Sequence, residues 1–82
     1  MPRHLKLSNV AKVLGALLRE RRLAAGLTQE EFSHRSGIDI SFISRVERGI
    51  TQPSIGVFLK IAETLEVSGS KLLTDLERGL SK

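Results

Sequence analysis

The residues with the clearest chemical potential lie on one face of a short predicted helix, Ile40 to Arg48. Ile43 and Val46 are three residues apart, so they share a face that we expect to turn inward. Arg45 then faces outward, and its planar guanidinium can donate two hydrogen bonds to O6 and N7 of a guanine, the commonest specific contact in the DNA major groove. The full outward set is Ile40, Ser41, Ser44, Arg45 and Arg48. This pattern predicts a surface that reads base edges.

Each of these residues also has a purely structural interpretation. An exposed arginine near the C-terminal end of a helix, such as Arg45, is favourable to the helix dipole without any ligand. Ile40 could meet a thymine methyl group, or it could be partly buried with Phe42, which could equally contact a DNA sugar. Ser41 and Ser44 are small enough to approach base edges or phosphates. We assign Ile40, Ser41, Ser44 and Arg45 to base reading because of the elements that hold them.

A second set of residues is placed for the DNA backbone. Gln29 stands one residue inside a predicted helix, beside the exposed N–H groups that make a helix N-terminus a ready anion site. After Gly49, a loop offers backbone amides and the hydroxyl of Thr51, which could grip a phosphate, although a plain solvated loop is the alternative. The predicted backbone-binding residues are Gln29, Arg48, Thr51 and Gln52.

Two capped helices joined by a tight turn must position these side chains. Thr28 is a natural N-cap, and Glu31 three residues later completes a capping box. Gly37 can adopt the left-handed conformation that stops the first helix. Asp39 can cap the second helix, and Gly49 ends it. A pair this compact holds its second helix at a fixed angle, as in the helix-turn-helix that places a helix in the major groove.

Glu47 is predicted to belong to the scaffold rather than to the DNA surface. It follows the inward-facing Val46, so it should not point straight into solvent. Arg22, on the preceding long helix, is the best candidate for a partner. We therefore predict an Arg22–Glu47 ion pair whose disruption would leave a buried charge.

Three further helices complete the prediction. The first runs from a Ser8 cap to about Ala25, with apolar residues at helical spacing. Ser54 caps a fourth helix, whose core stripe we expect to be Ile55, Phe58, Leu59, Ala62 and Leu65. A final helix starts at Ser68 or Ser70 and carries Leu72, Leu73 and Leu76. Because no segment alternates with a period of two, we expect an all-α, compact bundle of five helices and no sheet.

The composition is that of one small globular domain with a basic start. The 82 residues are 40% hydrophobic and 27% charged, with no cysteine and two histidines, which excludes disulfides and a Cys/His zinc site. Residues 1–26 hold six lysines and arginines against one glutamate, and the whole chain has a net charge of +4, which suits a polyanionic partner. We expect residues 1–7, with Arg3 and Lys6, to form a flexible basic arm ahead of a domain at 8–80. A domain this small, without disulfides or a bound metal, should gain stability by self-association.

Nothing in the sequence favours catalysis, a cofactor or a membrane. His4 lies in the arm and His34 on a polar helix surface, with no nucleophile placed near either. Glu30 and Glu31 are adjacent, so they diverge by about 100° around a helix and cannot share a substrate. No apolar run approaches the length of a membrane span, and no signal-peptide core follows the N-terminus. We expect a cytoplasmic protein that is not an enzyme and needs no metal.

The stretch GLTQEEFSHRSGIDISFISRVERGITQPS resembles the lambda-repressor-like, XRE-type family of helix-turn-helix DNA-binding domains. The match continues through FLKIAETLEVS and KLL and so covers about residues 8–76. The resemblance implies a five-helix domain that binds operator DNA as a dimer, with Gln29 on a phosphate. It also implies base reading by outward residues of the third helix, and the family's Arg–Glu pair maps onto Arg22 and Glu47. Among small stand-alone members, the controller proteins of restriction–modification systems are most similar in architecture.

Two positions depart from the family pattern. Ser33 stands where the motif usually has alanine, and its hydroxyl can bond back to a carbonyl one turn earlier. Ile40 and Ser41 stand where some phage repressors use glutamines for adenine recognition. The operator sequence therefore cannot be taken from those repressors.

Together these features predict a sequence-specific transcriptional regulator that binds double-stranded DNA as a homodimer, on an operator with two half-sites. Half-sites should lie about one helical turn, roughly 34 Å, apart. We expect the two-fold interface on the outer surface of the fourth and fifth helices, including Leu73, Leu76 or Leu80. The main alternative is an antitoxin-type module that binds a toxin or other protein and has secondary DNA binding. A third is a coating protein that binds DNA by charge alone, with steep salt dependence and no preferred site.

Overall fold

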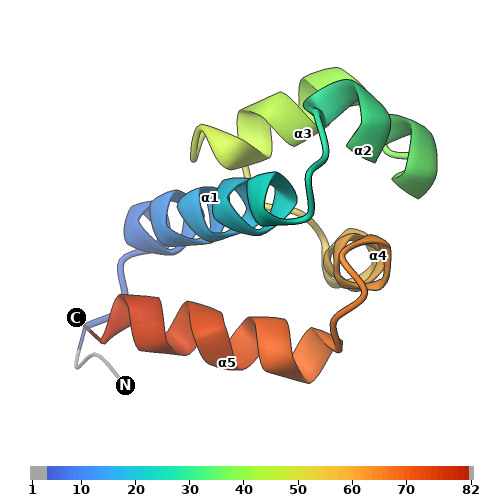
Figure 1. The fold of residues 1–82 in the computed structure, drawn as a ribbon. Helices are drawn as coiled ribbons and strands as arrows, with labels where there is room; N and C mark the ends of the chain where they lie inside the picture. The colour runs from blue at the N-terminus through green and yellow to red at the C-terminus, as the bar shows by residue number, and fades with distance from the viewer. Residues whose placement is uncertain (1–3, 82) are drawn as a thin grey trace.

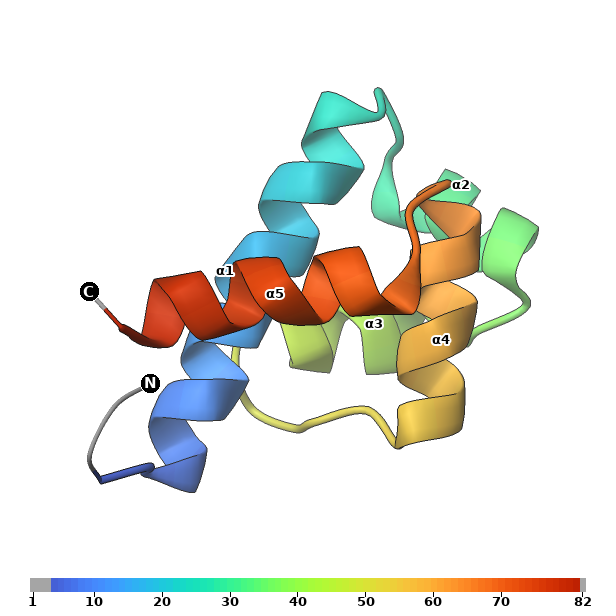
Figure 2. The same cartoon turned by 90° about the horizontal axis from the view of Figure 1, so that it is seen from below.

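The computed structural model describes residues 4–81, which form five α-helices and no strand (Figure 1). They are α1 (Leu7–Ala24), α2 (Gln29–Ser36), α3 (Ile40–Glu47), α4 (Ile55–Thr64) and α5 (Gly69–Leu80). Helix α3 packs on one side of α1 and α5 on the other, while α2 packs against α3 and α4, and α4 joins α2 to α5 at one end of the bundle. Seen from below, α5 crosses α1 (Figure 2). The expected all-α bundle of five helices is confirmed.

Side chains cap four of the five helix starts. Thr28 forms the predicted capping box with Glu31, and Asp39 accepts from the amides of Ser41 and Phe42 at the start of α3. Ser54 caps α4 through the amide of Val57 at 3.2 Å. Of the two candidates for α5, the cap is Ser68, whose hydroxyl accepts from the amide of Lys71 at 3.0 Å, and Ser70 lies inside the helix.

The predicted start of the first helix was wrong by two residues. Helix α1 begins at Leu7, and the N-cap position is Lys6, which makes no side-chain cap. The amides of Asn9 and Val10 donate to the Lys6 carbonyl, so the first turn forms without the Ser8 hydroxyl. Water can satisfy the remaining amides because this turn is exposed. Leu7 is therefore not part of an arm, and residues 1–3, with Arg3, lie outside the described part of the chain.

The core is built from one face of each helix. Its buried apolar residues include Leu14 and Leu18 of α1, Phe32 of α2, and Ile43 and Val46 of α3. Helices α4 and α5 add Phe58, Ile61, Ala62, Leu72 and Leu76. Leu65 and Leu80 are partly buried against this cluster.

The prediction that Ile55 and Leu59 belong to the core stripe of α4 was wrong. Ile55 is 72% exposed and Leu59 is 52% exposed. The inward face of α4 is instead set by Phe58, Ile61 and Ala62, so Leu59, one position past Phe58, is rotated by about 100° away from the core. On α5, Leu73 is likewise 45% exposed beside the fully buried Leu72. Helices α4 and α5 thus carry apolar side chains that residues 4–81 do not cover.

No helix within residues 4–81 is both long and apolar enough to cross a membrane. The same residues contain no group of three or more histidine, aspartate or glutamate side chains that could hold a metal ion.

Candidate nucleic-acid interface

The turn between α2 and α3 is fixed by hydrogen bonds that the sequence did not predict. Gly37 has a φ of 74°, the left-handed conformation expected at this helix end. The Ser36 hydroxyl accepts from the amide of Ile38 at 3.1 Å. Ser33 does not bond to a carbonyl one turn earlier, as expected, but donates forward to the Ile38 carbonyl at 2.5 Å. That carbonyl belongs to the turn and has no helical partner, so the hydroxyl supplies one.

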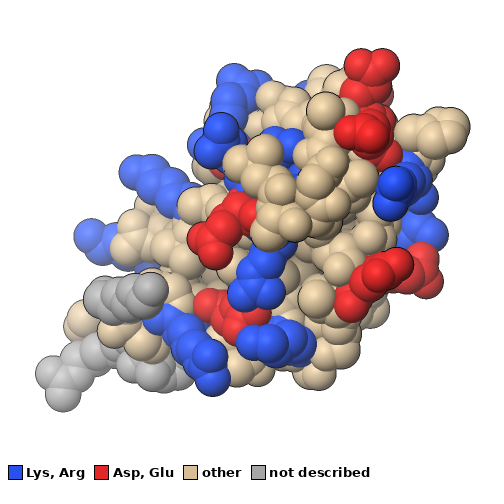
Figure 3. All heavy atoms as spheres, viewed as in Figure 1, with Lys and Arg blue, Asp and Glu red and all other residues tan. Residues whose placement is uncertain are grey.

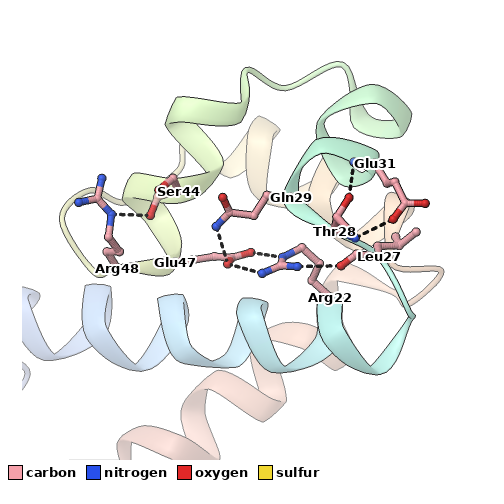
Figure 4. A network of polar contacts seen from close by, with 8 residues as sticks. All are labelled: Arg22, Leu27, Thr28, Gln29, Glu31, Ser44, Glu47 and Arg48. Atoms are coloured by element: carbon pink, nitrogen blue, oxygen red, sulfur yellow. Dashed lines mark hydrogen bonds and ion pairs between the residues drawn. The ribbon is translucent and has the colours of Figure 1, made fainter.

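The Arg22–Glu47 ion pair is present and ties α1 to α3 (Figure 4). Arg22 Nε donates to Glu47 Oε2 at 2.7 Å and its second nitrogen, Nη2, donates to Oε1 at 2.9 Å, which is the bidentate geometry. Arg22 Nη1 donates to the Leu27 carbonyl at 2.7 Å. Both side chains are under 10% exposed. The hydrogen bonds that Arg22 donates to Glu47, together with the charge of Glu47, raise the pKa of Arg22 against the opposing effect of burial.

Gln29 joins this pair from the first turn of α2. Its side-chain amide nitrogen donates to Glu47 Oε1 at 3.1 Å, and Figure 4 shows its side chain turned toward the pair. The amide group has a second N–H, which this bond leaves over for another acceptor. The sequence predicted that Gln29 contacts a DNA phosphate but did not predict its hydrogen bond to Glu47. Through this bond, one carboxylate joins α1, α2 and α3.

The outward face of α3 carries most of the predicted base-reading residues. Ile40 is 41% exposed and so is not buried against α2, and Ser41 and Arg45 are also exposed. Ser44 is only half-buried, and its backbone carbonyl accepts from Nε of the exposed Arg48 at 3.3 Å. The structure therefore leaves Ile40, Ser41, Arg45 and Arg48 exposed on the outward face of α3, with Ser44 half-buried among them.

Phe42 packs rather than facing outward. It is half-buried against the core cluster, which favours the packing interpretation of this residue. The Arg45 guanidinium lies 5.7 Å from the centroid of its ring, within range of a cation–π contact. Arg45 also donates to the Ser41 hydroxyl at the long distance of 3.5 Å. The sequence did not predict either contact of this side chain.

The loop after α3 is tethered to the start of α1. The Gln52 side-chain amide donates to the Leu7 carbonyl at 3.2 Å, and Thr51 is half-buried. Gly49, at a φ of 74°, ends α3 as predicted. The two predicted loop contacts to phosphate therefore start from a loop of defined shape.

Charge is distributed unevenly around the helix pair. Figure 3 shows Lys and Arg side chains over the start of α1 and the C-terminal end of α3, whereas Asp and Glu side chains lie over α2, beside α4 and between α1 and α5. Among the acidic groups near the reading surface is Asp39. Its hydrogen bond from the Ser41 hydroxyl lowers the pKa of Asp39, and the amides of Phe42 and Ser41 and the charge of Arg45 act in the same direction.

Comparison with known proteins places this geometry among DNA-binding domains. A family model described as Helix-turn-helix, HTH_3, matches residues 18–72, about two thirds of the chain. An uncharacterised HTH-type transcriptional regulator of Mycobacterium tuberculosis is 37% identical over 58 residues. That match covers 71% of this chain but only 41% of the relative, so the chain spans less than half the length of that curated relative.

Two solved structures of controller proteins share the fold over nearly their whole length. The restriction–modification controller protein C.AhdI from Aeromonas hydrophila is 39% identical, covers 76% of this chain and 94% of its own, and has a TM-score of 0.72. The restriction–modification controller protein C.Esp1396I, solved as a tetramer in complex with its natural 35 base-pair operator, is 27% identical. It covers 89% of this chain and 96% of its own, with a TM-score of 0.80.

Proposed function

The chain belongs to the HTH_3 helix-turn-helix family of transcriptional regulators, and we propose that it binds a specific operator as a homodimer. In this proposal each subunit places α3 in the major groove of one of two half-sites, which lie about one helical turn, roughly 34 Å, apart. It acts in the cytoplasm, on double-stranded DNA, through a domain that we place at residues 7–80, because α1 begins one residue before the domain start expected from the sequence.

The observation that carries the proposal is the orientation of α3. The buried Arg22–Glu47 pair, joined by Gln29, holds α3 against α1 and α2. Ser41 and Arg45 lie on the opposite, exposed face of α3. The small hydroxyl of Ser41 and the planar guanidinium of Arg45 are suited to hydrogen bonds with base edges. We assign base reading to Ile40, Ser41, Ser44 and Arg45. Contacts to the DNA backbone are assigned to Gln29, Arg48, Thr51 and Gln52.

Apolar side chains on α4 and α5 support the homodimer. Ile55, Leu59 and Leu73 are each at least 45% exposed. Beside them lies an open groove of about 260 Å³, lined by Val10, Leu14, Gln52, Pro53, Ile55, Phe58, Leu73 and Leu76. Contiguous apolar surface of this kind marks an interaction site more often than it marks bare surface. A second copy of the chain would cover it by presenting the same face about a two-fold axis.

The residues of the proposed interface differ from those expected from the sequence. Leu76 is 6% exposed and belongs to the core, because α5 turns it inward one turn after Leu72. Ile55 and Leu59, which the sequence assigned to the core, take its place in the proposed interface beside Leu73. Leu80 is partly buried and lies at the margin.

The similarity to controller proteins suggests the kind of regulator. C.Esp1396I and C.AhdI match this chain over almost their full length, and the former is described with its natural operator. We therefore propose a controller-type regulator that has the DNA-binding fold and the dimer interface in a single domain.

Selection of bound fragments from a random DNA pool tests the proposal, followed by titration of the selected and a scrambled duplex at fixed salt. We expect the selected duplex to contain two related half-sites and to bind at least about 10³-fold more tightly than the scrambled one. Light scattering should show two subunits per particle. Equal affinity for both duplexes would contradict sequence-specific regulation, and a monomer at every concentration would contradict the interface.

A further inference from the structure

Three side chains on the reading face of α3 form a linear chain of hydrogen bonds. The Ser41 hydroxyl donates to Asp39 Oδ2, and the Arg45 guanidinium donates to the Ser41 oxygen at 3.5 Å. Asp39 Oδ2 also accepts from the amides of Ser41 and Phe42, at 3.1 and 3.3 Å. The carboxylate therefore occupies a fixed place at the N-terminus of α3, with the hydroxyl of Ser41 bonded to it.

The direction of the bond decides what Ser41 can offer to a ligand. A free serine hydroxyl can donate one hydrogen bond and accept two. A hydroxyl bonded to a carboxylate makes a charge-assisted bond, roughly twice as strong as a bond between neutral groups. The proton of Ser41 is therefore held by Asp39, and only the lone pairs of its oxygen are left for an outside partner. The contact with Arg45 already uses the oxygen in this way, since the arginine can only donate.

We propose that Asp39 is a specificity-determining residue that positions Ser41 as a hydrogen-bond acceptor toward DNA. In the major groove, the groups that donate to an acceptor are N4 of cytosine and N6 of adenine. On the strand that it faces, Ser41 should therefore favour adenine or cytosine over guanine or thymine, which present acceptors there. The inference rests on the proposed function, because it assigns a preference to one residue of the same reading face.

The charge of Asp39 has a second consequence. A carboxylate on the face that approaches DNA repels the phosphates of every sequence alike. An aspartate is ionised at neutral pH, and the hydrogen bonds from Ser41 and from backbone amides lower the pKa of Asp39 further. Asp39 therefore weakens binding to all DNA while it sharpens the choice of base at one position. This combination distinguishes it from a residue that only caps α3.

The test compares Asp39→Gly, Ser41→Ala and the double variant on a panel of operator duplexes. The panel carries each of the four base pairs at every position of one half-site, and affinities are read by fluorescence anisotropy at fixed salt. Asparagine at position 39 would still accept from the Ser41 hydroxyl, so glycine is used instead. Glycine at an N-cap costs only a few tenths of a kcal/mol, so Asp39→Gly should fold, and a thermal melt checks this. Ser54→Ala, which removes the cap of α4 instead, is the matched control.

We expect the wild-type protein to favour an amino-bearing base by about fivefold at one position, the lower end of the range for a single base pair. Asp39→Gly and Ser41→Ala should both remove the preference at this position and leave the others unchanged, and the double variant should lose nothing more. Asp39→Gly should in addition bind scrambled DNA more tightly, because it removes a negative charge. Ser54→Ala should lower the melting temperature without changing the base preference.

Two results would overturn the inference. The first is that Asp39→Gly retains the wild-type preference at every position. The second is that it weakens all duplexes equally, as a purely structural cap would. If the wild-type protein itself shows no base preference at any position, the proposed function fails together with the inference, so the two failures are distinguishable.

Discussion

Gly15 of α1 lies directly against the backbone carbonyl of Val46 in α3. A Cβ placed on Gly15 would clash with Val46 O and lie only 2.7 Å from Glu47 O, so only glycine permits this approach. The same turn of α3 carries the carboxylate that binds Arg22. Two independent contacts, one steric and one ionic, therefore hold the C-terminal end of α3 on α1.

Gly15→Ala should push α3 away from α1. Alanine gains up to about 1 kcal/mol of helix propensity, but the obstacle is a backbone oxygen that cannot rotate aside. Overpacking of this kind costs about 1–3 kcal/mol, so we expect a net loss of stability and weaker operator binding. Gly56→Ala on α4 is the matched control, because its Cβ would meet nothing closer than 4.0 Å and should stabilise slightly. Urea unfolding of both variants measures the difference, and a stable Gly15→Ala protein would contradict the close approach.

Glu47→Ala should be strongly destabilising. It leaves the buried guanidinium of Arg22 without its carboxylate and frees the side chain of Gln29. Removing one partner of a buried pair costs about 3–5 kcal/mol. Urea unfolding and operator titration are the measurements, and an unchanged free energy of unfolding together with unchanged affinity would count against the scaffold role. Replacing Arg22 and Glu47 together by apolar residues of similar size should recover much of the stability.

The exposed pair Lys60–Glu63 gives the control for this prediction. Its two side chains are 49% and 72% exposed, although its N–O distance of 2.7 Å matches the shortest one of the Arg22–Glu47 pair. Solvent and salt screen such a pair, so Glu63→Ala should barely change the unfolding curve.

The sequence predicted local features more accurately than contacts between helices. The capping residues Thr28, Asp39 and Ser54 located helix starts because a cap is decided within a few residues of chain. The prediction of Ser8 as the N-cap of α1 was wrong because an exposed first turn needs no side-chain cap. Which apolar residues of α4 are buried depends on how the other helices pack against it, so Ile55 and Leu59 could not be excluded from the core by spacing alone.

The sequence predicted which residues of α3 face outward, but it did not predict the hydrogen bonds that these and neighbouring side chains form. Outward position follows from helical period, which identified Ser41 and Arg45. The partners Gln29–Glu47 and Ser41–Asp39 depend on side-chain rotamers and on how the helices pack, and a linear pattern does not contain them. The need for glycine at position 15 likewise comes from a helix that is distant in sequence.

Glu66→Gly should stabilise the protein. Glu66 follows α4 with a φ of 59°, the left-handed region, and among the described residues other than glycine it alone has a positive φ. A side chain in this conformation costs about 1 kcal/mol, which glycine avoids. A rise in melting temperature is therefore expected. Gly37 has a φ of 74° and open space where a Cβ would stand. Gly37→Ala should therefore lower the melting temperature, because it places a side chain in the left-handed conformation.

The Asp75 carboxylate should make stability depend on pH. The hydrogen bond from Lys71, followed by the charges of Lys71 and Arg21, lowers the pKa of Asp75 below its ordinary value of 3.8. A lowered pKa in the folded state stabilises the protein above the unfolded pKa, and this contribution is lost as pH falls through the folded pKa. Melting temperatures of the wild type and Asp75→Asn should therefore differ most near neutral pH and converge below about pH 4. A constant difference across this range would contradict the assignment.

Arg45 and Arg48 should separate base reading from phosphate binding. Both are exposed arginines on α3 or at its C-cap, so their replacement removes the same charge. Arg45→Ala should cost about 1–3 kcal/mol on the preferred operator and relax the preference at one base pair. Arg48→Ala should weaken all sequences alike, and removing its bond to one phosphate should reduce the slope of log affinity against log salt by about 0.9. Titration of both variants on the operator and on a scrambled duplex at several salt concentrations distinguishes the two roles. If Arg45→Ala instead weakens both duplexes by the same factor, Arg45 binds phosphate and the base-reading surface must be reassigned.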